Sequence, residues 1–203
     1  MKFSLLLTDY KIGIKQMLSK FFENIRLILL YPTAAWDTFK NEKVNFSRFF
    51  LQIVSPVIIF YGICLLVGQS LSTLSTASLP YISLYALFVT VIYLLAFFVS
   101  YIIIKSLIPL FNGENNEVYA AFLIFYSALP FYFSQMITSV FPSLIFVKLF
   151  SLYSLYLFYL GCVKLIKPDP DRKIAFYLVA LLSVIGIHLL LYFAVILPVY
   201  NLL

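Results

Sequence analysis

The sequence predicts an all-α, polytopic membrane protein with five transmembrane helices, preceded by a cytoplasmic amphipathic helix and a short helical elbow. Composition is the first reason, because 64% of the 203 residues are hydrophobic and the 11% that are charged are too few for a soluble domain's surface. Run length is the second, because apolar segments long enough to cross about 30 Å of hydrocarbon follow one another from Phe49 onward. These segments do not alternate apolar and polar residues, which disfavours a β-barrel.

Residues 1–48 are predicted to form a cytoplasmic head that begins with an amphipathic helix. One face of this helix is apolar and carries Ile14, Met17, Leu18, Phe21, Phe22, Ile25, Ile28 and Leu29. The other face is polar and carries Lys15, Gln16, Ser19, Lys20, Glu23, Asn24 and Arg26. This pattern favours a basic helix in the membrane plane, apolar side toward the lipid, attracted by anionic lipids of the cytoplasmic leaflet. A helix packed on the protein's own loops is the alternative.

The second element of the head is a short helical elbow over PTAAWDTFKNEK. Pro32 ends the helix before it and is well suited to start the next one. Trp36 and Phe39 are spaced three apart on one face, and tryptophan prefers the level of the lipid headgroups. Pro32, Trp36 and Phe39 are therefore candidate interface residues, and Asn45 or Ser47 is expected to cap the first span.

Residues 49–203 are predicted to form the transmembrane domain. The turn-forming stretches STLSTASLP, PLFNGENNE, FPS and KPDPDRK separate five apolar segments. We expect the spans at about 49–71, 82–107, 118–140, 143–166 and 174–198. Pro56 lies within the first span and Pro130 within the third.

Basic residues set the expected orientation. All of them except Lys148 precede the first span, or lie beside the loop after the second span or the loop after the fourth, and positive-inside logic makes that side cytoplasmic. The N-terminus is then cytoplasmic and the C-terminus outside. Lys148, near the outer end of the fourth span, is expected to snorkel outward, and a lysine facing a polar cavity is the alternative.

The third span has a regular pattern of small residues. Ala120, Ser127 and Ser134 recur every seven positions, with Ala121, Ala128 and Gln135 beside them. Small residues let helices approach closely, and Pro130 frees backbone groups that need partners in a bilayer. We interpret these residues as a packing surface inside the bundle, with a hinge or a polar pocket between spans as the alternative.

Residues suited to catalysis are sparse. All eight acidic residues lie outside the predicted spans, and neither a catalytic motif nor a metal-ligand spacing is present. Cys64 and Cys162 fall in apolar runs and are expected to be buried thiols. His188, near the middle of the fifth span, is expected to bond a neighbouring span, with a proton or ligand site as the alternative. We therefore expect no enzyme activity, no metal and no cofactor.

A family resemblance follows from the order of these features. A YPTAAW elbow precedes five spans, FNGENNEVYAAFLIFYSALP contains Gly113 and Pro130, and YSLYLFYLGCVKLIKPDPDRKIAFYLVAL contains Gly161 and Ala175. From about residue 24 to 194 this order resembles the Yip family of Ypt/Rab-GTPase-interacting membrane proteins, in particular its bacterial branch. The resemblance implies five spans, a cytoplasmic N-terminus, a multi-pass protein of the bacterial inner membrane and no enzymatic chemistry. The DLxGP-type motif of the eukaryotic members, which act through partner proteins in membrane traffic, is absent.

Three functions from different classes are weighed against these features, the third being a lipid-handling enzyme. The first is a non-enzymatic scaffold or adaptor that binds other membrane proteins or itself, with Gly161 among its packing residues. The alternative is a small channel or carrier with a polar path near Pro56, Pro130, Lys148 and His188. A lipid-handling enzyme would need an acid or nucleophile from NGENNE or KPDPDRK. Nothing in the sequence suggests a nucleic-acid partner.

Overall fold

A computed structural model describes residues 19–72, 79–114 and 116–197. The described residues are helical without a strand, and they contain five helices that are long and apolar enough to cross a membrane. These are Phe46–Leu71, Leu79–Leu110, Tyr119–Val140, Pro142–Ile166 and Lys173–Ile196. The predicted fold class is confirmed, and the predicted spans agree within three residues at each end, although position 198 lies outside the described residues.

Local winding divides several spans into shorter elements. In chain order they are α2 (Pro32–Lys40), α3 (Phe46–Phe49), η1 (Phe50–Val54), α4 (Ser55–Ser72), α5 (Leu79–Leu110), α6 (Tyr119–Val140), η2 (Pro142–Leu152), α7 (Tyr153–Gly161), η3 (Cys162–Ile166), α8 (Lys173–Leu191) and η4 (Tyr192–Ile196). A further helix covers residues 19–30. Asn45 caps α3, because its side chain accepts a hydrogen bond from the Arg48 N–H at 2.9 Å. The cap is therefore Asn45, one of the two residues expected from the sequence.

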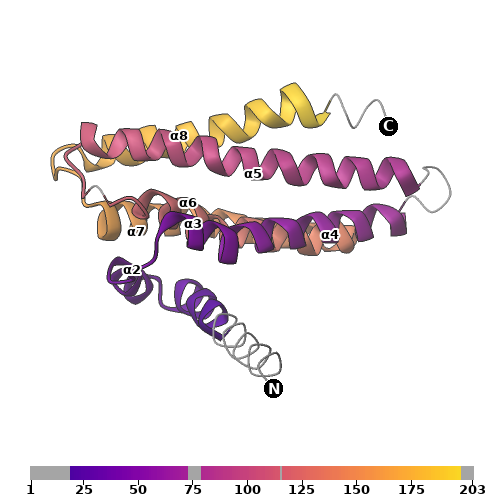
Figure 1. Cartoon of the computed structure of the whole chain (residues 1–203), viewed down its shortest axis with the longest axis horizontal. Helices are drawn as coiled ribbons and strands as arrows, with labels where there is room; N and C mark the ends of the chain where they lie inside the picture. The colour runs from indigo at the N-terminus through magenta and orange to yellow at the C-terminus, as the bar shows by residue number, and fades with distance from the viewer. Residues whose placement is uncertain (1–18, 73–78, 115, 198–203) are drawn as a thin grey trace, which may run out of the picture.

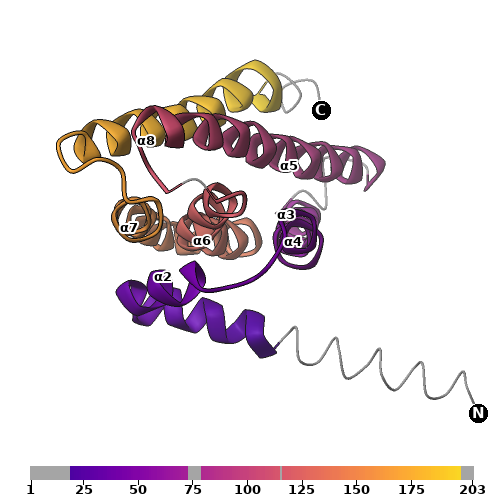
Figure 2. The same ribbon diagram turned by 60° about the vertical axis from the view of Figure 1, so that its left-hand side comes forward.

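The helices form three layers (Figures 1 and 2). One outer layer contains α5 and α8, and the middle layer contains α4, α6 and α7. The other outer layer is the head, formed by the helix at residues 19–30 and by α2. The loop after α5 and the loop after η3 lie at the same end as α2, which we call the basic end (Figure 1).

The central element is α6, because it is covered by both outer layers. Its residues that are fully buried are Ala120, Ala121, Phe122, Leu123, Phe125, Tyr126, Leu129 and Ser134. Of the five candidate spans it is the most enclosed. In its apolar stretch of 18 residues 72% of the residues are buried, against 11% in the corresponding stretch of Lys173–Ile196. The helix with the most small and aromatic residues therefore becomes the core of a bundle whose last helix is mostly exposed.

Three spans depart from regular α-helix, namely the first, the fourth and the fifth, and the departure in the first span has a clear cause. Pro56 has no N–H to donate, and the five residues before the turn that contains it wind as a π-helix, η1. The fourth span opens with η2, an eleven-residue 3₁₀ helix with a non-helical residue, Leu144, and none of its residues is buried. Runs of 3₁₀ helix this long are uncommon.

Candidate functional site

The core of the head is aromatic and lies inside the protein. Trp36 and Phe39 of α2 are both 0% exposed. The Phe39 ring stacks on Tyr126 of α6 with 4.1 Å between centroids, and the Trp36 ring meets Tyr126 edge-on at 6.5 Å. The interpretation of Trp36 as a residue at the lipid headgroups is therefore wrong, because α6 offers a wall of aromatic rings that buries the indole completely.

The helix at residues 19–30 also packs on the bundle. Its most buried residues are Ile28 and Asn24, at 0% and 3% exposed, whereas Phe22 is 64% exposed. The Asn24 amide donates to the Tyr126 hydroxyl at 3.1 Å, and the Tyr153 hydroxyl donates to the Leu29 carbonyl at 3.2 Å. The assignment of Asn24 to the solvated face was wrong, because a buried partner satisfies its amide. Residues 14–18 of the predicted helix lie outside the described residues.

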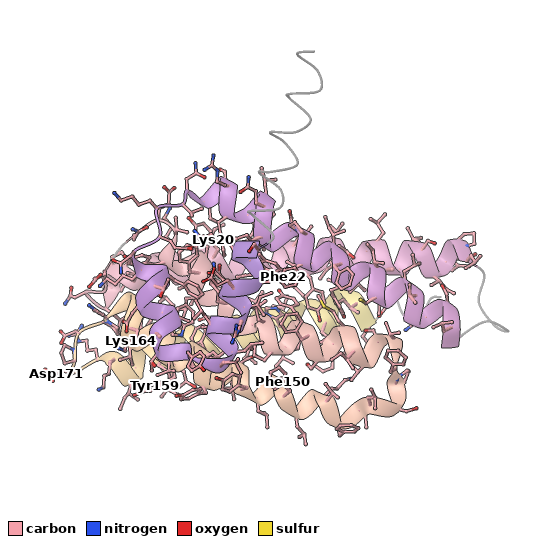
Figure 3. All side chains as sticks on the ribbon, turned by 90° about the horizontal axis from the view of Figure 1, so that it is seen from below. Lys20, Phe22, Phe150, Tyr159, Lys164 and Asp171 are labelled. Atoms are coloured by element: carbon pink, nitrogen blue, oxygen red, sulfur yellow. The ribbon has the colours of Figure 1, made fainter. Side chains whose placement is uncertain are left out.

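The head reaches well along the bundle. Tyr153 lies about 20 Å from the end of its span at Ile166, taking ~1.5 Å per residue. Its bond to the Leu29 carbonyl therefore places the helix at residues 19–30 beside the membrane-spanning part of the fourth span. Figure 3 shows this helix, with Lys20 and Phe22 labelled, crossing the face of the bundle. Packing on protein, the alternative in the sequence analysis, is the arrangement found.

Gly161, the last residue of α7, makes room for the Trp36 ring. A Cβ atom added to Gly161 would lie 2.5 Å from Leu123 Cδ1 and 2.9 Å from Trp36 Cζ2. Both distances are shorter than real Cβ contacts, and the indole is rigid. Glycine is therefore required here by the close approach of α2 to the fourth span.

Ion pairs fasten the head to both loops at the basic end. The Lys40 ammonium binds Glu114 Oε1 at 2.6 Å, and Lys167 binds the same oxygen at 3.4 Å. Asp37 pairs with Lys164 at 3.1 Å. Within the head, Lys20 pairs with Glu42 at 2.8 Å. The two loops are joined to each other as well, because the Glu114 N–H donates to the Ile166 carbonyl at 2.6 Å.

Together these segments form one surface, which we call the platform. It comprises the described residues 19–48, 111–114, 116–118 and 167–172. Lys40 and Lys167 lower the pKa of the Glu114 carboxyl below its ordinary value of 4.5, chiefly through the hydrogen bond from Lys40. In return, the hydrogen bond to Glu114 raises the pKa of Lys40 above 10.5.

The Glu114 ion pairs make the stability depend on pH. A carboxyl whose pKa is lower in the folded state contributes stability above its unfolded pKa, and this contribution is lost as pH falls through the lowered value. We expect the melting temperature of the detergent-solubilised protein to fall as the pH drops below about 4.5. The melting temperature of the Glu114→Gln variant should fall less over this pH range than that of wild type. Glu117→Gln, outside these ion pairs, should behave like wild type, and an unchanged Glu114→Gln profile would contradict the prediction.

A comparison with known protein families matches a Yip1 domain to residues 26–193. The chain belongs to the Yip1 family. This match confirms the resemblance seen in the sequence, and it extends from the helix at residues 19–30 into η4. Searches of curated proteins and of solved structures return no match. Yip1 membership is consistent with a membrane protein of non-enzymatic type.

A second feature of this Yip1-family chain is a polar cavity inside the bundle, toward the end opposite the platform. It has a volume of about 410 Å³. Its polar lining residues are Tyr61, Tyr85, Tyr93, Gln135, Lys148, His188 and Tyr192. The structure thus brings Lys148 and His188 to one cavity. Pro56 is exposed on α4 and absent from this lining, so it does not belong to a path through these residues.

An apolar cavity of about 320 Å³ adjoins the polar one. The two linings share Phe131, His188 and Leu189. Ser127 and Ala128, predicted as packing residues, line the apolar cavity, whereas Ala120 and Ser134 are fully buried. The small residues of α6 are therefore divided between helix packing and a cavity wall.

Pro130 shapes this wall through its neighbour's backbone. Proline displaces the helical hydrogen bonding around it, and the Phe131 N–H donates to Ser154 Oγ of α7 at 3.2 Å. Pro130 itself is buried and absent from both linings. Its effect on the cavities is through the Phe131 N–H, which bonds to Ser154 of the apolar lining.

Removing the Ser154 hydroxyl should destabilise the bundle. Ser154→Ala leaves the Phe131 N–H without its partner, which we expect to lower the free energy of unfolding by about 1–3 kcal/mol. Thermal unfolding followed by circular dichroism measures this. Ser183→Ala is the matched control, because the exposed Ser183 hydroxyl bonds only within its own helix, to the Val179 carbonyl. Equal melting temperatures for the two variants would show that Ser154 has no such role.

Proposed function

We propose that this chain is a non-enzymatic membrane scaffold or adaptor, which binds other membrane proteins through the platform. The observation that carries this proposal is the attachment of the head. Trp36 and Phe39 are buried in the bundle, and Lys40, Glu114 and Lys167 join α2 to both loops. A head fixed in this way is a shaped surface rather than a flexible tether, and a shaped surface suits recognition with little ordering cost.

The charge of the platform indicates what it would contact. Some basic residues at this end are exposed and form no ion pair among the described residues: Arg26, Lys43, Arg48, Arg172 and Lys173. Such cations attract the anionic headgroups of a cytoplasmic leaflet and acidic patches of partner proteins. The platform would therefore sit at the membrane surface with its partner.

The same cations support the proposed location. Positive-inside logic puts the platform in the cytoplasm, which gives a cytoplasmic N-terminus and an outer C-terminus in a bacterial inner membrane. Cysteine labelling in intact cells tests this orientation. A cysteine at the exposed position Ser143 should react with an impermeant reagent, whereas one at Asp171 should react only after permeabilisation. The reverse pattern would overturn the orientation.

Co-purification in mild detergent, with quantitative mass spectrometry, tests the scaffold. We expect the combined variant Arg26→Gln, Lys43→Gln and Arg172→Gln to lose the membrane proteins that wild type recovers, because these exposed cations are removed from the platform. Lys148→Gln, which removes a cation at the other end, is the matched control. Recovery of the same membrane proteins with the combined variant as with wild type would contradict the proposal.

The polar cavity favours one second candidate, a small carrier. Lys148 and His188 line one cavity, as a polar path would require, although Pro56 and Pro130 do not. Under the scaffold proposal, His188→Ala leaves the cellular phenotype nearly intact. Loss of the phenotype in a folded His188→Ala protein that retains its partners would favour the carrier.

A further inference from the structure

The two cavities meet at His188 and differ in polarity. The polar cavity holds Lys148, Gln135 and several tyrosines, whereas the apolar cavity is walled mainly by leucine, isoleucine, valine and phenylalanine side chains. The His188 ring lies between them, 6.1 Å from the Tyr93 ring and 6.4 Å from the Phe131 ring. Polar and apolar spaces in contact are suited to an amphiphile, a molecule with one polar and one apolar part.

Lys148 gives the polar cavity an unbalanced positive charge. No ion pair to its ammonium occurs among the described residues, and neither lining contains a carboxylate. A cation within a membrane span normally finds a counter-charge or reaches the interface. An anionic ligand would supply that counter-charge from outside the chain.

His188 offers a second polar contact. Its Nδ1 lies 2.8 Å from the Val184 carbonyl, which requires a proton on Nδ1 because a carbonyl only accepts. The other ring nitrogen, Nε2, has no partner among the described residues. In the neutral ring it accepts a hydrogen bond, so a ligand hydroxyl fits there.

The cavities open sideways, toward the surroundings of the bundle. Leu189, Tyr192 and Leu155 line the cavities and are 51%, 46% and 39% exposed. They belong to α8, η4 and α7, and α8 has only two buried residues, Phe176 and Ala180. A ligand would therefore enter from the bilayer.

We propose that this paired cavity binds an anionic membrane phospholipid. Its phosphate would lie at Lys148, near the end of the fourth span opposite the platform, and one acyl chain would pass His188 into the apolar cavity. The charge of Lys148, the lateral opening and the split in polarity all match this ligand. Both volumes fall within the range of about 300–1,000 Å³ that is usual for ligand sites. The proposal does not depend on the scaffold function.

Native mass spectrometry of the full chain tests the site. The protein is reconstituted in vesicles of phosphatidylglycerol and phosphatidylcholine in equal amounts, then extracted in mild detergent. Wild type should retain phosphatidylglycerol in preference, and Lys148→Gln should lower that preference about fivefold. Lys105→Gln, whose ammonium lies over the Tyr101 ring and outside both linings, should keep it. Ala128→Phe, which fills the apolar cavity, should lower retention of both lipids.

Several results would overturn the proposal. The first is that wild type shows no preference between the two lipids, and the second is that Lys148→Gln keeps the wild-type preference. The third is release of the lipid by inorganic phosphate alone, which would indicate a site for a soluble anion. A dimer mass without lipid would show a second copy over the cavities. Lys148 is exposed, so its replacement leaves the core intact, and loss of lipid with unchanged partner recovery would separate this site from the scaffold.

Discussion

Trp36→Ala should lower the free energy of unfolding by about 3–5 kcal/mol, the largest effect we expect from one substitution. Its side chain is fully buried and contacts Phe39 and Tyr126 edge-on. Truncation leaves a cavity between α2, α6 and the fourth span. The head should then separate from the bundle while the five spans stay helical.

Thermal unfolding followed by circular dichroism, together with limited proteolysis of the head, measures this loss. Phe22→Ala is the matched control, because it removes an aromatic ring of the same head that is 64% exposed. We expect the control to change stability little and to leave the head protected. Equal melting temperatures for Trp36→Ala and Phe22→Ala would show that the head is not held by its aromatic core.

Gly161→Leu should have the second largest effect, about 3 kcal/mol, at the upper end of the cost of overpacking. The added Cβ alone would approach the Trp36 ring to 2.9 Å, and the remaining carbons would occupy the position of the indole. We expect Trp36 to be displaced. Because Trp36 is the only tryptophan, the fluorescence of the protein reports on it alone. The emission should shift to longer wavelength, and the indole ring should become accessible to a soluble quencher.

Gly186→Leu provides the comparison, since a Cβ at Gly186 has no neighbour within 4 Å. It should leave the emission unchanged and keep or slightly raise the stability, because leucine favours helix over glycine. A Gly161→Leu protein with wild-type emission would show that the space beside Gly161 can adjust.

The spans could be predicted from the sequence because membrane crossing is a local property. Each segment needs enough consecutive apolar residues and a turn at either end, and both are visible in the sequence. The 3₁₀ winding of η2 could not be predicted, because its composition is equally suited to an α-helix. Local composition determines where a span lies more strongly than how it is wound.

The placement of the head could not be predicted, because it depends on distant partners. A tryptophan in this sequence context is typical of the membrane interface. Only the aromatic face of α6 and the space beside Gly161 show that Trp36 is buried. Asn24 is polar, and only the Tyr126 hydroxyl explains its burial. Glu114, which joins α2 to both loops, gave no signal beyond its charge.

The polar residues of the spans were predicted only in part. In the sequence Lys148 and His188 are unusual for their position, and the structure places both at one cavity. Proline breaks a helix, which makes Pro56 a candidate for the same path, yet it is exposed on α4 and absent from the cavity lining. The tyrosines that complete the cavity were not identified, because tyrosine is abundant throughout the chain.

The attachment of the head also sets an order for biosynthesis. Asn24 and Tyr126 are 102 positions apart, and Asp37 and Lys164 are 127 apart. During synthesis from the N-terminus, the head therefore emerges from the ribosome long before the helices that bury it. Trp36 remains without its pocket until the fourth span has been inserted. Closure of the head is thus a late step of assembly, and a chain that stalls before Gly161 presents an unburied aromatic segment to chaperones and membrane proteases.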